Sequence, residues 1–334
     1  MPSKKQKVRK EPRAPQTPSE RLVEALRTRF KSGDVALLMK EGGYARVTAV
    51  CPTGIEALDR HVIGIGGLPY GRGVELEGEE GSGKTTLLSK FMAAGQRDGC
   101  VVAFADSENK FNPEWGVLHG MDTEAIVQLQ SETLEDFHEH ALFVLQKQRQ
   151  VMIALDSVAA IPTKLELSEG TDIPAEHARL WAKFLRPFGQ LVARKQALCV
   201  FVNQPRNKIG VMYGNPETTF GGRALKHFYS LRLHVSHGKG VKEEGAHTAR
   251  YMHVSANKNQ LAPPHRKATL KLDYTEGFDD HWATINHAKD VGCLETSKAA
   301  TEASWREATK NLGWGEAEAE TYPDSSEQPP GSLP

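Results

Sequence analysis

The sequence GEEGSGKT at residues 78–85 decides the fold of this chain, because it matches the pattern G-x-x-x-x-G-K-[ST] at every position. Residues 73–77 before it are typical of a short strand, and residues 86–94 after it are typical of a helix. A glycine-rich turn between a strand and a helix presents backbone N–H groups and the positive end of the helix to phosphate oxygens. The stretch therefore predicts a phosphate-binding loop in an α/β domain.

The same loop predicts how a nucleotide would be held. Lys84 would reach the β- and γ-phosphates, and the Thr85 hydroxyl would bind Mg²⁺. An apolar strand at residues 151–156 ends in Asp156, which would lie beside the loop at the carboxyl edge of the sheet and hold Mg²⁺ through water. ATP and Mg²⁺ are the expected cofactors. The loop residues assigned to ATP are Gly78, Glu79, Glu80, Gly81, Ser82, Gly83, Lys84, Thr85 and Thr86.

Composition is ordinary for a globular protein: of 334 residues, 39% are apolar and 25% are charged, with zero net charge. This length allows one large core, or a main domain with a small satellite. No stretch approaches the ~20 apolar residues of a membrane span, and the N-terminus has no apolar segment typical of a secretory signal. The four cysteines have no paired spacing, and Cys100 and Cys199 are expected to be buried thiols. A reduced, cytoplasmic protein with no membrane partner is the expectation.

Apolar runs alternate with helical patterns through the middle of the chain, which predicts an α/β fold with a mostly parallel sheet covered on both faces. Strands are expected at residues 74–77, 101–105, 151–155, 198–202 and 230–235, and helices at 85–94, 134–148 and 175–195. Residues 250–255 and 268–274 are typical of later, antiparallel strands. A helix at residues 301–312 suggests a small C-terminal appendage.

The pattern divides the chain into five segments. A basic arm at residues 1–18 and an acidic tail at 315–334 are expected to be disordered; the arm could contact DNA or simply be solvated. Residues 19–45 form a helix, capped by Ser19 and ending near Phe30, and a glycine-rich linker. The apolar stripe of this helix needs a partner surface, on its own domain or on a neighbouring subunit. A nucleotide-binding core at 46–278 precedes a small C-terminal domain at 279–314.

Two more strands end in polar residues of possible catalytic use. Residues 102–108 end in acids, and Glu108 is the best candidate for the group that orients or deprotonates an attacking water. Taken alone, the residue would more readily be interpreted as a solvated acid at the end of a strand. Residues 198–204 end in Asn203 and Gln204, and an amide there can donate to a γ-phosphate and so report its presence. The alternative is a pair of hydrogen-bonding residues at a strand end.

Residues 203–226 read NQPRNKIGVMYGNPETTFGGRALK. Together with the phosphate loop, GGLPYGR at residues 66–72 and LDSVAA at 155–160, this segment resembles the bacterial RecA recombinase family, over roughly residues 19–280. Replicative helicases and archaeal recombinases share the loop but not this segment. The resemblance implies a RecA-like ATPase core with an N-terminal oligomerisation helix. It also implies a DNA-dependent ATPase that forms a filament on single-stranded DNA, pairs it with homologous duplex and exchanges strands in recombination, DNA repair and the SOS response. A repressor, cleaved with this chain as co-protease, is a further candidate partner.

The resemblance also assigns roles around the nucleotide. Glu108 resembles the catalytic glutamate that activates water, and Gln204 resembles the γ-phosphate sensor that couples nucleotide to DNA. Asp156 belongs to the strand on the metal side. Asn112 and Trp115 fall where the family contacts adenine, with Trp115 in place of a tyrosine, so that stacking is still possible. The alternative for Trp115 is a core aromatic.

Two loops would contact DNA by the same resemblance. The first, at residues 167–176, is acidic and matches the family poorly, so none of its residues is assigned. The second spans residues 205–222, where glycines would permit disorder without DNA and order with it. Two arginines seven positions apart on a predicted helix match DNA-facing residues of the family; their alternative is a solvated helix face. The candidates for DNA binding are Arg179, Arg186, Arg206, Lys208, Ile209, Gly210, Met212, Tyr213, Gly221 and Gly222.

The chain departs from the family at the expected subunit interface. In the family two lysines of K-N-K reach the γ-phosphate of the adjacent subunit. Here Lys258 matches the first of these lysines and is assigned its catalytic role, whereas Gln260 replaces the second. His227 replaces a residue that is usually aromatic in the family. Three readings follow: an active recombinase, a divergent paralogue that binds ATP and DNA as a structural or regulatory filament with little hydrolysis, or an unrelated kinase or helicase. The full set of nucleotide-site residues favours the first.

Overall fold

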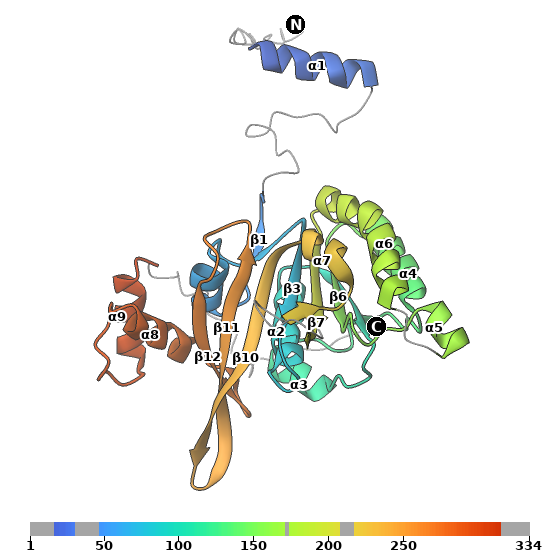
Figure 1. Cartoon of the computed structure of the whole chain (residues 1–334). Coiled ribbons are helices and arrows are strands. Elements are labelled where there is room, and N and C mark those ends of the chain that lie inside the picture. Colours follow the sequence, from blue (N-terminus) through green and yellow to red (C-terminus); the bar gives the residue numbers. More distant parts are fainter. Residues whose placement is uncertain (1–16, 31–46, 171–173, 208–216, 315–334) are drawn as a thin grey trace, which may run out of the picture. The chain divides into compact units, whose positions relative to one another are not determined.

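The computed structural model describes residues 17–30, 47–170, 174–207 and 217–314, and it divides into two units, residues 1–48 and 49–334 (Figure 1). The described part of the first unit is helix α1 (Pro18–Phe30). The Thr17 hydroxyl accepts a bond from the Glu20 N–H at 3.3 Å, and the Glu20 carboxylate accepts one from the Thr17 N–H at 2.7 Å. This reciprocal cap corrects the one expected at Ser19, which already lies inside the helix. Residues 1–16 of the basic arm, the linker glycines and the acidic tail lie outside the described residues.

A nine-stranded sheet of order β13-β12-β11-β10-β3-β7-β6-β4-β5 forms the centre of the second unit. Every pair from β10 to β5 is parallel, whereas β11, β12 and β13 join by antiparallel pairing. The strands are β3 (Arg72–Glu77), β4 (Val101–Asp106), β5 (Val127–Gln128), β6 (Val151–Asp156), β7 (Leu198–Asn203), β10 (Tyr229–Glu243), β11 (Ala246–Asn259), β12 (Lys267–Asp273) and β13 (Gly277–Phe278). Two further pairs, β1 (Val50–Cys51) with β2 (Leu68–Pro69) and β8 (Pro205–Asn207) with β9 (Glu217–Thr219), lie outside this sheet. The mostly parallel sheet expected from the sequence is confirmed.

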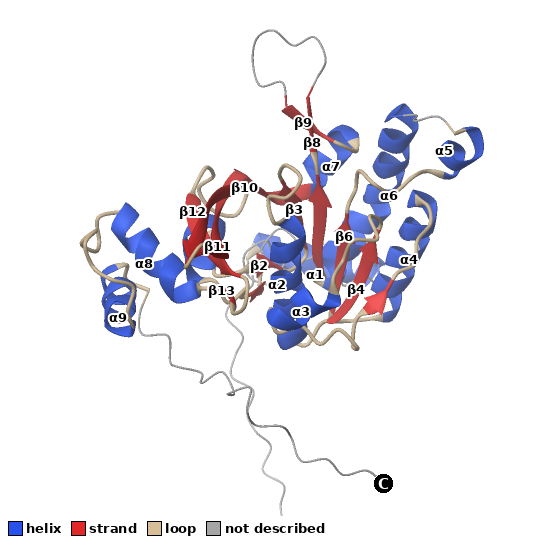
Figure 2. Cartoon of the chain, turned by 90° about the horizontal axis from the view of Figure 1, so that it is seen from below, coloured by secondary structure: helices blue, strands red, loops and turns tan. Residues whose placement is uncertain are grey.

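Helices cover both faces of the sheet, because the central strands are apolar on both sides. On β6, Met152 and Ala154 join the cluster beneath α2, while Ile153 and Leu155 join the cluster beneath α4 and α6. Figure 2 shows α4 and α6 together on one side of the sheet. The helices of this unit are η1 (Ala57–Ile63), α2 (Lys84–Arg97), α3 (Pro113–Leu118), α4 (Leu134–Lys147), α5 (Lys164–Glu169), α6 (Pro174–Lys195), α7 (Gly222–Phe228), α8 (Asp280–Asp290) and α9 (Glu302–Asn311).

Strands β10 and β11 are longer than the sequence pattern predicts. β10 pairs with β3 only over residues 229–234, and the remainder of β10 and β11 forms a hairpin that extends beyond the sheet (Figure 1). The register of the hairpin shifts between His237 and Gly240 and again between Val241 and Lys242. These shifts are β-bulges, which increase the local twist. The hairpin was missed because its outer part is solvated and has no alternation of apolar and polar residues.

The C-terminal helices α8 and α9 pack on one another around Ile285, Ala288, Leu294 and Ala308. Asp280, at the start of α8, ties this pair to the core, because its carboxylate accepts a 2.6 Å bond from the Glu56 N–H at the start of η1. Burial of this carboxyl raises its pKa to about 7. Its charged form is therefore disfavoured in the folded chain.

This raised pKa gives stability a pH dependence that Asp280→Asn should remove. The folded state holds the proton up to a pH of about 7, whereas the unfolded chain releases it near the usual value of 3.8, so stability falls as pH rises between these values. We expect Asp280→Asn to raise Tm at pH 8 by roughly 3–6 °C, from about 1–2 kcal/mol after allowance for partial exposure. The gain should disappear near pH 4. Thermal melts across this range check it, with Asp290→Asn on the same helix as the control; a gain independent of pH would contradict the assignment.

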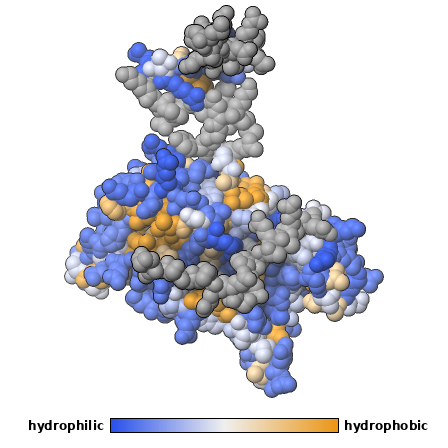
Figure 3. All heavy atoms as spheres, turned by 180° about the vertical axis from the view of Figure 1, so that it is seen from behind, coloured by the Kyte–Doolittle hydropathy of each residue, from blue (hydrophilic) through white to orange (hydrophobic). Residues whose placement is uncertain are grey.

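The surface of the molecule is mostly hydrophilic, with apolar side chains in scattered patches (Figure 3). None of the helices described in the structure is long and apolar enough to cross a membrane. Cys51, Cys100 and Cys199 are buried free thiols, as expected for the latter two.

Candidate nucleotide site

The loop between β3 and α2 presents unpartnered groups toward the carboxyl edge of the sheet. Gly83 adopts φ of +97° immediately before α2, and no described side chain caps the helix there. The Ser82 hydroxyl is buried, and it has no hydrogen-bond partner among the described residues. An uncapped helix N-terminus and an orphaned buried hydroxyl are the features that an anionic ligand satisfies. The loop therefore fits a bound phosphate.

Lys84 lies within this loop rather than in solvent. Its Nζ donates to the carbonyl oxygens of Gly78 at 2.8 Å and Glu79 at 2.6 Å, and the residue is 7% exposed. Burial lowers the pKa of the amine, while nearby carboxylates, with Asp156 first among them, oppose that shift. The carbonyl groups of the loop thus fix the position of the Lys84 amine beside the start of α2.

Thr85 and Asp156 meet across the edge of the sheet. The Thr85 hydroxyl donates to the Asp156 carboxylate at 2.5 Å, joining the first turn of α2 to the end of β6. Burial raises the pKa of Asp156 to about 6, with the Glu108 and Asp106 carboxylates adding to the effect. Hard oxygen ligands of this kind are those that Mg²⁺ prefers. A divalent cation would also neutralise the buried acids, so this pair fits the expected metal.

Glu108 lies at the end of β4 and is held from two other strands. Its Oε1 accepts bonds from the Ser157 hydroxyl and from the Gln204 amide, each at 2.9 Å. Its Oε2 pairs with the Lys110 Nζ at 3.3 Å. The Asp106 carboxylate fixes the turn by accepting the Glu108 N–H at 3.2 Å. One carboxylate thus connects the residues that follow β4, β6 and β7.

Asn203 connects Gln204 to the rest of the sheet. Its buried side-chain amide donates to the Glu75 carboxylate on β3 at 2.8 Å and to the Phe220 carbonyl at 3.2 Å. Its oxygen accepts the Gln204 N–H at 2.9 Å. Arg232 on β10 pairs with the same Glu75. Asn203 therefore connects both Gln204 and Phe220 to the strand that leads into the phosphate loop.

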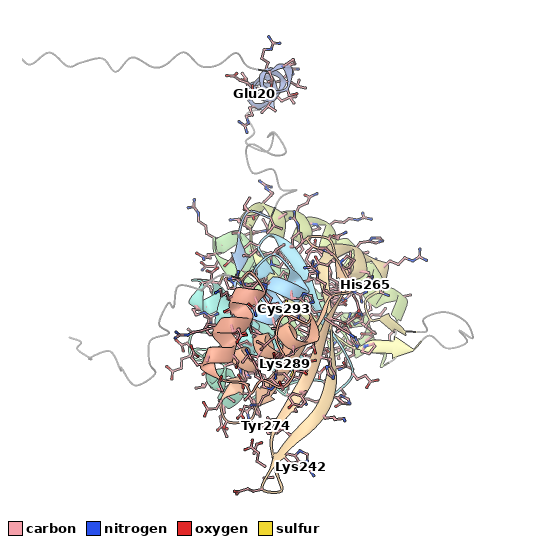
Figure 4. The ribbon with its side chains drawn as sticks, turned by 90° about the vertical axis from the view of Figure 1, so that its left-hand side faces the viewer. Glu20, Lys242, His265, Tyr274, Lys289 and Cys293 are labelled. Carbon is pink, nitrogen blue, oxygen red and sulfur yellow. The ribbon has the colours of Figure 1, made fainter. Side chains whose placement is uncertain are left out.

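The two residues expected near adenine lie at the start of α3. Asn112 is exposed and caps this helix, since its side chain accepts the Glu114 N–H at 2.9 Å. Trp115 is half-buried, with its ring centroid 6.3 Å from the rings of both Tyr274 and His119. Tyr274 follows β12 and is labelled in Figure 4. Trp115 therefore keeps an exposed part and belongs to an aromatic group, and its contact with adenine stays a prediction.

The structure separates the expected DNA-binding residues into two groups. Arg179 and Arg186 are both exposed on α6, and Arg179 forms an ion pair with Glu176 at 2.6 Å. Arg206 lies on β8, which pairs with β9 (Figure 2). The remaining side chains of the second loop, Lys208, Ile209, Gly210, Met212 and Tyr213, lie outside the described residues.

Two expectations about these loops are corrected. Gly221 and Gly222 do not lie in a loop that needs DNA to order it, because they form the start of α7 with φ of +86° and +75°. The first loop is helical in part: α5 covers Lys164–Glu169, and α6 starts at Pro174. The signal for α5 was present in the sequence, because Thr163 and Glu166 form a capping box.

Lys258 and Gln260 lie at the end of β11, away from Lys84 in the sequence. The Lys258 Nζ donates to the Lys226 carbonyl at 2.8 Å, and burial lowers the pKa of this amine. Gln260 is exposed, as is His227 on α7. Hydrogen bonds join Thr85 to Asp156 and Gln204 to Glu108, and Lys84 interacts electrostatically with both of these carboxylates. Lys258 contacts α7 instead.

The sequence model of the RecA N-terminal domain family matches residues 20–279 of this chain. The chain belongs to the RecA family. It is 36% identical to protein RecA of Thermus aquaticus over 305 residues, covering 90% of this chain and 88% of that one. It is 37% identical to protein RecA of Francisella tularensis subsp. novicida, covering 82% and 75%. A crystal structure of the RadB recombinase shares the fold, with a TM-score of 0.50, 17% identity, and coverage of 68% of this chain and 98% of that one.

RecA-family membership confirms the resemblance drawn from the sequence.

The sequence analysis missed two residues of the site. The Lys110 Nζ pairs with Glu108 and lies 3.9 Å from a carboxylate oxygen of Glu80. The signal available in the sequence was that Lys110 follows the candidate base by two residues. Arg250 donates to the Gly81 carbonyl at 2.8 Å from 169 residues away, and no local pattern indicates such a contact.

Proposed function

We propose that this RecA-family chain is a DNA-dependent ATPase that assembles as an ATP-bound filament on single-stranded DNA, pairs that strand with homologous duplex DNA and exchanges strands. The observation that carries the proposal is the double hold on Glu108 by Ser157 and Gln204, beside Lys84 and Asp156. This arrangement combines a candidate general base with a group that can sense a phosphate. An isolated phosphate-binding loop would need neither.

The residues of the site divide the work of hydrolysis. Lys84 and the backbone N–H groups of the loop would bind the β- and γ-phosphates, and Thr85 with Asp156 would hold Mg²⁺, which supplies charge neutralisation at the phosphates. Glu108 would orient an attacking water and accept its proton. For that, its carboxylate has to exchange the Gln204 bond for the water, and Gln204 then has a free amide to donate elsewhere.

The contacts of Asn203 support a link from this site to DNA. Gln204 follows Asn203, whose amide also holds Phe220 at the far end of the second candidate DNA loop. A shift of Gln204 would therefore displace Asn203 and, through it, Phe220 at the far end of that segment. Binding to single-stranded DNA would rest on backbone charges rather than on base edges, and so would tolerate any sequence. Arg179 and Arg186 on α6, with Arg206 on β8, are the candidates for these contacts.

The departure at Gln260 favours a second reading, a filament that binds ATP and DNA but hydrolyses ATP slowly. In the structure Lys258 contacts its own α7, so a role for it in the neighbouring subunit's ATP site requires assembly. With Gln260 in place of the second lysine, one cation that would stabilise transition-state charge is missing.

Changing Gln260 to lysine tests this reading. If the missing cation limits hydrolysis, kcat for ATP should rise on the order of 100-fold, the contribution that one positioned donor makes to a transition state. Steady-state ATP turnover on saturating single-stranded DNA measures it, and Gln260→Ala is the uncharged control. An unchanged kcat in Gln260→Lys would remove the missing lysine as the cause of slow hydrolysis.

The proposed function is tested by ATP hydrolysis with and without single-stranded DNA over a range of protein concentrations. An ATP site shared between subunits should give turnover that DNA stimulates and that rises cooperatively with protein. Binding of DNA without stimulated turnover would favour the structural filament. Turnover that is proportional to protein and indifferent to DNA would contradict both and favour an unrelated nucleotide enzyme.

A further inference from the structure

Arg250 on β11 joins the base of the hairpin to the phosphate loop. Its Nη1 donates to the Gly81 carbonyl oxygen at 2.8 Å. Its Nη2 approaches Gly83 so closely that a Cβ added to that glycine would lie 2.5 Å from it. The Arg250 Nε is buried and lacks a hydrogen-bond partner among the residues that the structure describes. The guanidinium group therefore lies against the loop instead of extending into solvent.

The hairpin contacts this loop from both of its strands. On β10, the Val235 carbonyl oxygen lies 2.1 Å from where a Cβ on Gly78 would be, and on β11 the Met252 Sδ lies 3.0 Å from the corresponding position on Gly83. Neither glycine has room for a side chain. The backbone at the start and at the end of the loop thus packs directly on the hairpin, and Arg250 contacts the loop at Gly81 and Gly83.

These contacts bear on how the loop can bind phosphate. Its backbone N–H groups can face a ligand only while the carbonyls of the same segment point elsewhere. Gly81 adopts φ of +73°, and its carbonyl is fixed by Arg250 on the side of the hairpin. An arginine is also always charged, so it adds a permanent positive charge beside the loop. Lys84 adds a positive charge as well, but it does not hold the Gly81 carbonyl, because its own amine bonds to the carbonyls of Gly78 and Glu79.

We propose that Arg250 is a positioning residue of the nucleotide site, which holds the loop from Gly81 to Gly83 in the conformation that binds the polyphosphate of a nucleoside triphosphate. The consequence is that nucleotide affinity depends on the hairpin formed by β10 and β11. This inference rests on the proposed function, since it concerns the ATP site of that function.

Direct titration of the full chain with a fluorescent ATP analogue tests the proposal. Arg250→Ala should weaken binding by about tenfold or more, because a hydrogen bond from a charged donor is lost together with its charge. Arg250→Lys should recover part of this loss, since lysine keeps the charge and one donor but not the planar fork. Lys242→Ala is the matched control: it removes one cation from the exposed outer end of the same hairpin (Figure 4) and should bind as the parent does.

Thermal melts without nucleotide separate positioning from a merely structural role. A lower Tm in Arg250→Ala with unchanged affinity in the folded protein would overturn the proposal, as would an equal loss of affinity in Lys242→Ala. Should Arg250→Ala not fold, Arg250→Gln replaces it, with the same expected loss of binding. A parent chain that fails to bind the analogue would refute the proposed ATP site and this inference with it. A parent that binds, beside Arg250 variants that bind equally well, would refute this inference alone.

Discussion

Replacing Lys84 by alanine should abolish ATP binding at micromolar concentrations and, with it, every ATP-dependent property of the chain. The amine is buried in the loop and held by two carbonyls, so it stands ready for the phosphates without further ordering. Charge-assisted bonds to phosphate are among the strongest in proteins, and we expect a loss of affinity on the order of 100-fold. Titration with a fluorescent ATP analogue measures it, and electron microscopy follows ATP-induced filaments.

Lys147→Ala is the control for this variant, because it removes an exposed lysine from α4. It should bind ATP and assemble as the parent does. Melting curves without nucleotide show whether Lys84→Ala keeps its fold. A folded Lys84→Ala protein that still forms filaments when ATP is added would show that this lysine does not bind the phosphates.

Glu108→Gln should keep ATP and DNA binding and lose turnover, by about 10²- to 10⁴-fold, the usual contribution of a positioned general base. Glutamine has the same shape, and its side-chain oxygen can still accept bonds from Ser157 and Gln204. It cannot accept a proton from water. Single-turnover and steady-state hydrolysis, measured beside nucleotide and DNA titrations, separate the loss of chemistry from a loss of binding.

Glu139→Gln on the exposed surface of α4 serves as its control and should leave kcat unchanged. If Glu108→Gln hydrolyses ATP at the parent rate, another group activates the water. If it loses ATP affinity instead, the carboxylate organises the site through its pair with Lys110 rather than through catalysis.

The sequence predicted the parts of this fold that depend on local pattern. Strands β6 and β7 were visible as continuous apolar runs because both of their faces are buried. Asp156 and Glu108 were placed together because parallel strands end at one edge of the sheet. In the structure Asp156 bonds to Thr85, Glu108 bonds to Gln204, and both carboxylates interact with Lys84. The phosphate loop itself was specified by residue types at fixed spacing.

The parts that escaped prediction depend on contacts distant in sequence. Arg250 reaches the loop only because β11 pairs with β10, which in turn pairs with β3, and nothing near residue 250 indicates that neighbour. The same holds for the bond from Asn203 to Glu75, which spans 128 residues. Gly221 and Gly222 were misread because glycine suits a helix start with positive φ as well as a flexible loop.

The two outermost strands of the nine-stranded sheet, β13 and β5, are each only two residues long. Such short edges offer few unpaired N–H and C=O groups to a second sheet, which limits aggregation by strand addition. Beyond His234, β10 no longer pairs with β3, and there it carries bulges together with Lys239 and Lys242, which protect an open edge in the same way. Within the part of the chain that the structure describes, the large sheet therefore offers little edge for amyloid-like stacking, even at high concentration.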